Sequence, residues 1–416
     1  MAIASSASLI GCRKGSSTNR PVKIGFVSPR TGALAAFSEA DPFVLSGIRK
    51  ALDGGLPIAG RVHPVEILEK DSRSDPNRAA EVASDLIKTD RVDLLVTANT
   101  PETVNPVSDQ AEINGVPCIS TDAPWQPYYF GRGGKLDQGF EWTYHFFWGT
   151  QELVAVYTSM WGSLPTNKVV GALWGNDNDG NSFSDPVQGF PPVLAAKGYK
   201  LIDSGRFQPA TSDFSAQINA FKSGGVEILT GVLSPPAFTT FWSQAAQQGF
   251  RPKIATIAKA LLFPASVESL GERANNLSTE VWWSPNHPFR SGVTGQTAKE
   301  FCAEYENLIK KPWTQPMGFK HALFGVAIDV LKRTKDIDSP EAIRAAIRET
   351  NYNSIVGPIA WTGTPVKNVC RTPLVGGQWQ WSDEKKIGVN LLVVNNENAK
   401  QIPTQTALKP LSYSGV

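Results

Sequence analysis

Short apolar runs alternate with amphipathic segments along most of this chain, and this alternation limits the fold more than any other feature. Each apolar run is long enough for one strand, and the segment after it repeats apolar residues at helical spacing. Buried strands that are followed by covering helices are typical of parallel sheets. The chain is therefore predicted to be an α/β protein.

The alternation occurs twice, which predicts two lobes of similar layout. The first series has strands at 22–28, 64–70, 92–97 and 116–120 and helices at 42–53, 76–89 and 102–114. The second series has strands at 168–174, 199–204, 226–233 and 253–258 and helices at 183–197, 213–223 and 236–248. Residues 294–349 return to helical spacing, and 355–395 contain short strands interrupted by Gly and Pro. A chain of 416 residues has room for two or three cores.

Helix ends support these assignments. Asp75 provides a side-chain oxygen where an N-cap is needed, and Pro76 suits the first helical turn. Gly115 is expected to end the helix 102–114 in a left-handed conformation.

The loops that follow the strands are candidates for a binding site, because ligands of open parallel sheets lie outside the carboxyl ends of the strands. These loops are 28–37, 97–102, 120–125, 174–182 and 234–236. Two lobes that face each other through these edges would form a cleft.

Composition excludes some partners. Forty basic and 38 acidic residues leave a net charge of +2, and no Lys/Arg block is interleaved with aromatic residues. The electrostatic signature of a nucleic-acid-binding protein is therefore missing. Twelve Trp, 20 Phe and 8 Tyr are expected mainly in cores and in part around a pocket.

No catalytic motif is complete. Gly131-Arg132-Gly133-Gly134 lacks the last glycine of a dinucleotide-binding loop, and the sequence NDNDG at 176–180 lacks the terminal Glu of a calcium loop. The four histidines show no metal-ligand spacing, and no GxSxG nucleophile motif is present. We expect no catalytic residue, no metal and no cofactor.

The cysteines are Cys12, Cys118, Cys302 and Cys370. Cys118 lies in an apolar run and is predicted to be buried, whereas Cys302 and Cys370 could form a disulfide in an oxidising compartment. The sequence Leu9-Ile10-Gly11-Cys12 has the form of a lipoprotein cleavage box, which would make Cys12 the acylated residue. The stretch before it lacks the charged start and apolar core of a leader, so a chance match stays open. No apolar run of 18 residues exists elsewhere, so a membrane contact is expected only through such a lipid anchor.

Several segments together resemble a known family. They are VKIGFVSPRTG from 22, DSRSDPNRAAEVASDLIKTDRVDLLV from 71, PVSDQAEINGVPCIS from 106, SDFSAQINAFKSGGVEIL from 212 and QAAQQGF from 244. This pattern, over about residues 22 to 350, resembles the type I periplasmic binding proteins of ABC importers, in the group that includes leucine/isoleucine/valine-binding proteins.

The resemblance implies two Rossmann-like lobes that are joined by a three-strand hinge. Lobe one would comprise 22–145 and 286–353, and lobe two 146–285 and 354–395. Residues 1–21 would be a leader remnant or tether, and 396–416 a C-terminal tail.

The resemblance also implies site residues. In lobe one these are Phe37, Asn99, Thr100, Glu102, Ser120, Thr121, Asp122 and Trp125, with Pro101 at the position of the family's carboxylate-binding Ser. In lobe two, Asp179 aligns with a closing Tyr, Leu233 or Ser234 with a second Tyr, and Ala258 or Lys259 with the acid that holds an α-ammonium. Trp174 and, further out, Trp282 and Trp283 add aromatic surface, although Trp283 could instead pack at the hinge.

The departures at these positions bear on the ligand. With Lys259 in place of an acid, lobe two is poorly suited to an α-ammonium and could suit a second carboxylate. Asp122 could serve as the ammonium partner instead, and Lys259 could be a solvated surface lysine.

The implied function is that of a monomeric, periplasmic or extracytoplasmic receptor that delivers a small carboxylate-bearing, amino-acid-like or aromatic ligand to an ABC permease. The alternatives are a ligand-sensing regulatory domain of the same architecture and an α/β hydrolase or transferase.

Overall fold

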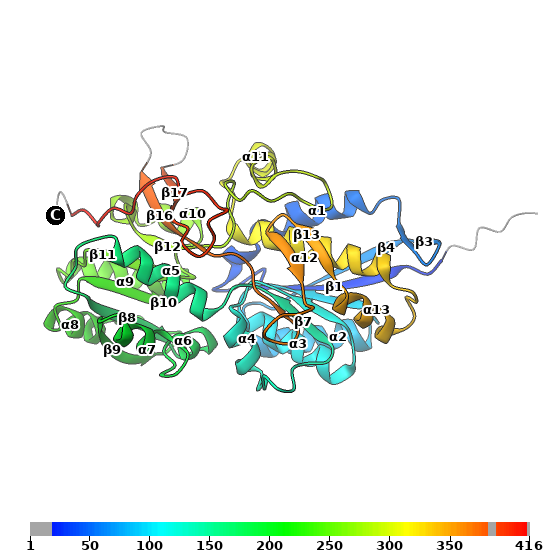
Figure 1. Ribbon diagram of the computed structural model, residues 1–416, viewed down its shortest axis with the longest axis horizontal. Helices are drawn as coiled ribbons and strands as arrows, with labels where there is room; N and C mark the ends of the chain where they lie inside the picture. The colour runs from blue at the N-terminus through cyan, green and yellow to red at the C-terminus, as the bar shows by residue number, and fades with distance from the viewer. Residues whose placement is uncertain (1–18, 382–387, 414–416) are drawn as a thin grey trace, which may run out of the picture.

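The computed structural model describes residues 19–381 and 388–413, so the predicted acylation site at Cys12 lies outside the described residues. Two lobes lie side by side along the longest axis (Figure 1). Each lobe contains one large sheet with helices packed around it, as the alternating pattern predicted.

Lobe one is built on a six-stranded sheet with the order β15-β7-β6-β5-β1-β4. Its strands, all parallel, are β1 (Val22–Ser28), β4 (Val65–Asp71), β5 (Leu94–Thr97), β6 (Cys118–Ser120), β7 (Thr143–Phe146) and β15 (Val369–Cys370).

The helices of lobe one are α1 (Asp41–Ala51), α2 (Pro76–Lys88), α3 (Pro101–Asn114), α4 (Trp125–Gly131), α11 (Ala298–Ile309), α12 (Gln315–Arg333) and α13 (Pro340–Arg348), with a short 3-10 helix at Ala35–Ser38. Two small hairpins complete the lobe: β2 (Leu56–Ile58) with β3 (Arg61–His63), and β13 (Asn351–Ser354) with β14 (Gly357–Ala360).

Lobe two is built on a seven-stranded sheet with the order β17-β16-β12-β11-β10-β8-β9. Its strands are β8 (Val169–Gly175), β9 (Lys200–Phe207), β10 (Ile228–Val232), β11 (Ile254–Ala258), β12 (Ser278–Val281), β16 (Val375–Trp381) and β17 (Val389–Asn395). The last two strands are antiparallel to their neighbours.

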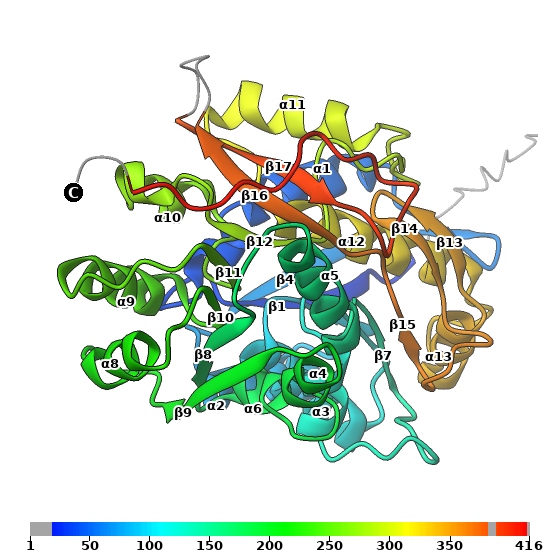
Figure 2. The same ribbon diagram turned by 60° about the vertical axis from the view of Figure 1, so that its left-hand side comes forward.

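The helices of lobe two are α5 (Thr150–Gly162), α6 (Asn178–Phe183), α7 (Phe190–Ala196), α8 (Ser215–Ser223), α9 (Pro235–Gln247) and α10 (Pro264–Glu268), with a 3-10 helix at Gly271–Ala274. The segment after β17, drawn in red, returns over this lobe (Figure 2), where the main-chain N–H of Leu411 donates to Lys253 O at 2.8 Å.

The chain crosses between the lobes three times, and the third crossing differs from the prediction. Crossings one and two follow β7 and β12, near the predicted boundaries 145/146 and 285/286. The resemblance places residues from 354 onward in lobe two, but β15 pairs in parallel with β7 of the first sheet. The return to lobe two therefore comes between Cys370 and Val375. The sequence pattern does not reveal this position, because a strand as short as β15 shows no recognisable periodicity.

Most predicted elements are confirmed to within a few residues, and the cap assignments hold. The Asp75 side chain accepts from the main-chain N–H of Arg78 at 2.8 Å, and Gly115 has a φ of 67°. The helix predicted at 183–197 is shorter than predicted, because only Phe183, the last residue of α6, and α7 are helical in this range. Gly189 is the N-cap residue of α7, and Pro191 is its second residue.

The three cysteines in the described ranges are buried free thiols. The prediction for Cys118 is confirmed, and the suggested disulfide between Cys302 and Cys370 is wrong. Within the same ranges, none of the helices has the length and hydropathy needed to cross a membrane.

The long helix α12 is the centre of lobe one, since most of its side chains are buried. Phe324 of this helix packs edge-on against Phe26 of β1, with 5.3 Å between ring centroids. Near the start of α12, Gly318 lies directly against the indole ring of Trp283, which is the second residue of the second crossing. Trp283 donates its Nε1–H to Ile355 O at 3.1 Å and is fully buried, so it packs at the hinge.

Gly318 and Gly47 provide a matched pair of helical glycines for a stability test. A methyl group at Gly318 would overlap the Trp283 ring, whereas Gly47 of α1 faces open space. We expect Gly318→Ala to lower the free energy of unfolding by about 1–3 kcal/mol through overpacking. Gly47→Ala should raise it by about 0.5–1 kcal/mol through helix propensity. Urea denaturation measures both, and equal effects of the two substitutions would contradict the packing described here.

Candidate functional site

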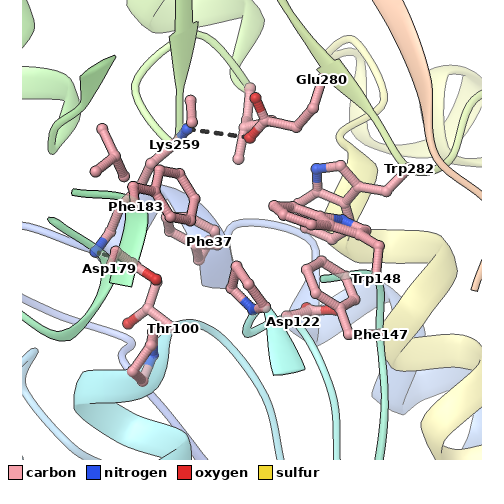
Figure 3. A pocket seen from close by; sticks show the side chains of 15 residues that line it. Phe37, Thr100, Asp122, Phe147, Trp148, Asp179, Phe183, Lys259, Glu280 and Trp282 are labelled. Atoms are coloured by element: carbon pink, nitrogen blue, oxygen red, sulfur yellow. Dashed lines mark hydrogen bonds and ion pairs between the residues drawn. The ribbon is translucent and has the colours of Figure 1, made fainter. Parts of the chain in front are cut away.

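A small cavity of about 30 Å³ lies between the lobes and is lined by residues that follow strand ends of both sheets (Figure 3). Lobe one contributes Phe37, Thr100, Pro101, Asp122 and Pro124. Lobe two contributes Asp179, Phe183, Val232, Ala258, Lys259, Leu262 and Glu280. The crossings contribute Phe147, Trp148 and Trp282. A mainly apolar wall with a few polar groups is typical of a small-molecule site.

Four residues in the loops that form this cavity have a strained backbone. Asn99, Thr100, Asp122 and Lys259 all have positive φ, at 77°, 69°, 62° and 68°. Thr100 also has a ψ of 154°, a combination that is otherwise nearly restricted to glycine. Each such residue costs about 1–3 kcal/mol and is retained where the surrounding structure forces it, most often at functional sites.

The aromatic side of the cavity comes from the hinge. Phe147 lies 4.8 Å from both Trp148 and Trp282, measured between ring centroids. Because these residues belong to two different crossings, the aromatic cluster couples the hinge to the cavity wall. On the opposite side, Phe37 of lobe one meets Phe263 of lobe two edge-on at 4.8 Å.

Lys259 lies at the centre of the charged side of the cavity. Its Nζ is 3.0 Å from Asp179 Oδ2 in the same lobe and 3.4 Å from both carboxylate oxygens of Glu102 in lobe one. Its side chain is only 7% exposed, so it is not a solvated surface lysine. The salt bridge to Glu102 therefore links the lobes directly.

Burial and these neighbours shift the proton affinities of the cluster. Burial raises the pKa of Asp179 to about 7, because the Lys259 ammonium offsets the loss of solvation only in part. Burial would lower the pKa of Lys259, but Glu102 and Asp179 outweigh it and raise the pKa. Burial likewise opposes ionisation of Glu102, but Lys259 outweighs it and holds the pKa of Glu102 below its usual value.

Glu280 borders the same side, and both of its oxygens are occupied. Oε2 accepts from the Tyr157 hydroxyl at 2.6 Å and from Thr279 Oγ1 at 2.8 Å. Oε1 accepts from the main-chain N–H of Lys259 at 3.1 Å, which is the dashed contact in Figure 3. Burial raises the pKa of Glu280.

A second polar cluster lies beneath the cavity in lobe one; this floor cluster consists of Lys320, Asp41, Asn99 and Asp122. Lys320 of α12 donates to the Asp41 carboxylate and to the main-chain oxygen of Phe37. Asn99, with its amide oriented to satisfy both ends, accepts from Lys320 Nζ and donates to Asp122 Oδ2, each at 3.0 Å. Burial raises the pKa of Asp122 well above its usual range. The cluster fixes the two strained loops to the long helix.

Four buried polar atoms at the cavity have no protein partner: Thr100 Oγ1, Trp148 Nε1, Trp282 Nε1 and Asp179 Oδ1. An unpartnered buried polar group costs about 1–3 kcal/mol, and a hydrogen bond to a bound molecule would remove that cost.

The structure brings some predicted site residues to the cavity and leaves others away from it. Phe37, Thr100, Asp122, Asp179 and Lys259 line the wall. Glu102 contacts Lys259, and Asn99 lies beneath Asp122.

Five predicted residues turn elsewhere. Ser120 pairs with His145 at 2.9 Å, and Thr121 donates to Phe146 O at 2.7 Å. Trp125 packs against Phe130, and Trp174 packs against Phe183 and Phe190 in the core of lobe two. Ser234 is the N-cap residue of α9. Their side chains are not part of the cavity wall.

Sequence reasoning missed Glu280, Phe147, Trp148 and Phe183. The crossing residues lie outside the strand-helix pattern, and Glu280 lies inside a strand, so a search of strand-end loops does not find them. In the described ranges, no three His, Cys, Asp or Glu side chains are grouped so as to hold a metal ion.

A family model described as a periplasmic binding protein matches residues 21–383. A leucine-binding protein from Thermotoga maritima is 20% identical, with a TM-score of 0.72 over 90% of this chain and 99% of its own. A branched-chain amino acid transporter substrate-binding protein from Streptococcus pneumoniae, in complex with isoleucine, is 17% identical, with a TM-score of 0.69 over 90% and 99%.

A solute-binding protein of an ABC transporter from Rhodopseudomonas palustris, in complex with 3,4-dihydroxybenzoic acid, is 17% identical, with a TM-score of 0.71 over 92% and 99%. These solved structures show the fold of the chain, with its parallel sheets in two lobes.

The floor cluster predicts a large stability effect at Lys320. We expect Lys320→Met to lower the free energy of unfolding by about 3–5 kcal/mol, because it leaves Asp41 buried without its cation. Lys320→Met combined with Asp41→Leu should recover much of that loss, since an apolar pair removes both charges. Thermal and urea unfolding measure the two variants, and a double variant no more stable than the single one would contradict the pairing.

Proposed function

The chain belongs to the periplasmic binding protein family, and from that premise we propose that it is the extracytoplasmic receptor of an ABC transporter. It captures a small carboxylate-bearing ligand, amino-acid-like or aromatic, between its lobes and delivers it to a membrane permease. It acts as a monomer and performs no chemistry on the ligand. The observation that supports this proposal best is a cavity whose wall is shared by both lobes and the hinge.

The shared wall gives the mechanism. A ligand that contacts both lobes binds the closed arrangement more tightly than an open one, and its differential affinity shifts the population towards closure. Phe37 in lobe one and Phe183 in lobe two would hold the apolar part of the ligand, while the crossings supply Trp148 and Trp282. Closing then removes the ligand from solvent without any covalent step.

Three of the four polar atoms without protein partners suit a ligand with hydrogen-bond acceptors. Thr100 Oγ1 and the two indole N–H groups are donors that a carboxylate could satisfy. The molecules bound in the two ligand complexes, isoleucine and 3,4-dihydroxybenzoic acid, both have a carboxyl group. They support the carboxylate-bearing class for this chain without selecting one member.

A thermal-shift screen of amino acids, aromatic acids and dicarboxylates tests the proposal. A ligand at 100 times its Kd should add about 2.7 kcal/mol to the stability of the folded state and raise Tm accordingly. If no member of these three classes raised Tm, the proposed function would be wrong.

Phe37 provides a specific prediction. Phe37→Ala should weaken binding of the solute found in the screen by at least about tenfold, or ~1.4 kcal/mol, because an aromatic contact in the cavity is lost. Phe250→Ala is the control, since Phe250 is equally buried in lobe two but packs against Phe221 and is not part of the cavity wall. Calorimetric titration should show reduced affinity in the first variant alone. Unchanged affinity in Phe37→Ala would exclude Phe37 from the site.

A further inference from the structure

The charges around the cavity select among the proposed ligands. Lys259 is the ammonium group in the described part of the wall, and carboxylates from both lobes already hold it: Asp179 at 3.0 Å and Glu102 at 3.4 Å. Asp179 is 4% exposed, so this pairing takes place in a largely dehydrated environment. Glu102 and Asp179 are already paired with the Lys259 ammonium, so neither carboxylate is free to balance a second ammonium group on the ligand.

The start of α3 is similarly occupied by the chain itself. Pro101 is the first residue of the helix and has no N–H, and Glu102 places a carboxylate in the first turn. The helix dipole stabilises a negative charge at this end of α3. The Glu102 carboxylate already provides that charge, so a ligand carboxylate is not needed at this helix terminus. Lys259 and Glu102 thus form an ammonium-carboxylate pair in the cleft that belongs to the protein.

The remaining carboxyl groups are poorly placed to bind a ligand ammonium. Both oxygens of Glu280 accept hydrogen bonds from the protein, and Asp122 Oδ2 accepts from Asn99. Asp179 Oδ1 is unpartnered, but the other oxygen of that group holds Lys259. The unpartnered atoms elsewhere in the wall are the Thr100 hydroxyl and the two indole N–H groups, which can all donate.

We propose that Lys259, held by Glu102 and Asp179, is the specificity-determining residue of this cavity and acts as a built-in ammonium group. It excludes ligands that have an ammonium, and the cavity therefore takes an aromatic carboxylate without one. This inference rests on the proposed function and narrows its ligand class.

Three probes with the same phenyl ring separate the alternatives: 3-phenylpropionate, phenylalanine and phenethylamine. Calorimetric titration of the wild-type protein should show 3-phenylpropionate binding at least about tenfold more tightly than either ammonium-bearing probe. Tighter binding of phenylalanine or phenethylamine would overturn the proposal, and so would an affinity equal to that of 3-phenylpropionate. No detectable binding of 3-phenylpropionate would overturn the aromatic-carboxylate class.

Removal of the built-in ammonium should reverse the preference. Lys259→Met leaves Glu102 and Asp179 without their cation, so phenethylamine should bind at least about tenfold more tightly than to the wild type. Adding Glu102→Gln to this variant should reduce that gain, because one of the two acceptors is then neutral. Absence of a gain in Lys259→Met would overturn the role of Lys259, whatever the wild-type protein binds.

Two further variants keep the test decisive. Lys253→Met is the matched control, because Lys253 pairs with Glu227 at 3.0 Å on the same lobe but is 51% exposed and lies outside the cavity wall; its probe affinities should not change. If Lys259→Met folds poorly, Lys259→Met with Asp179→Asn retains Glu102 as acceptor with less buried charge, and the same gain is expected. Failure of the proposed function would give a different result, with no solute of any class in the screen raising Tm.

Discussion

The salt bridge between Lys259 and Glu102 joins the end of a strand in lobe two to the start of a helix in lobe one. Its position follows from the orientation of the two sheets, whose carboxyl ends face each other so that the loops from each lobe meet. Lys259 itself has a positive φ and directly follows β11, and Glu102 follows the strained loop after β5. The cavity, its charges and the contact between the lobes all depend on this arrangement of the loops.

Those loops carry a local conformational cost that the lobes around them must offset. Asn99 and Asp122 have left-handed backbones, and a hydrogen bond between their side chains connects them above Lys320. Lys320 is part of α12, the most deeply buried helix of lobe one, so the rigid core positions the binding loops. The first two crossings add a second constraint, because Phe147 and Trp282 pack together while lining the cavity. Movement of the hinge would therefore shift the aromatic residues that line the cavity.

The sequence predicts the fold better than it predicts the site, for physical reasons. Strands such as β1 and β10 are buried local runs, and helices such as α2 have a cap and an apolar stripe within a few residues of each other. Those signals are local. The two-residue strand β15 has no such signal, so the third crossing was placed too early.

Site residues depend on contacts between distant segments. Lys320 and Asp41 are 279 positions apart, and Lys259 and Glu102 are 157 apart. Nothing near Lys259 in the sequence distinguishes a solvated lysine from a buried one; the distinction comes from two carboxylates on other elements. Trp125 and Trp174 are the opposite case: the resemblance predicts both at the site, but both pack inwards. An aromatic residue near a strand end can pack in either direction, and the sequence does not show which.

The central claim is that a solute is enclosed by movement of one lobe against the other. Pulsed electron-electron double resonance tests this movement by measuring the distance between two spin labels. The labels are attached at Ile113→Cys in lobe one and Val187→Cys in lobe two, with Cys12 replaced by serine. Both labelled positions are exposed, at 76% and 77%, while Cys118, Cys302 and Cys370 are buried. With the solute that raises Tm, the account predicts that the distance distribution shifts and becomes narrower as the closed state is populated. A distribution that stays the same at saturating solute would contradict it.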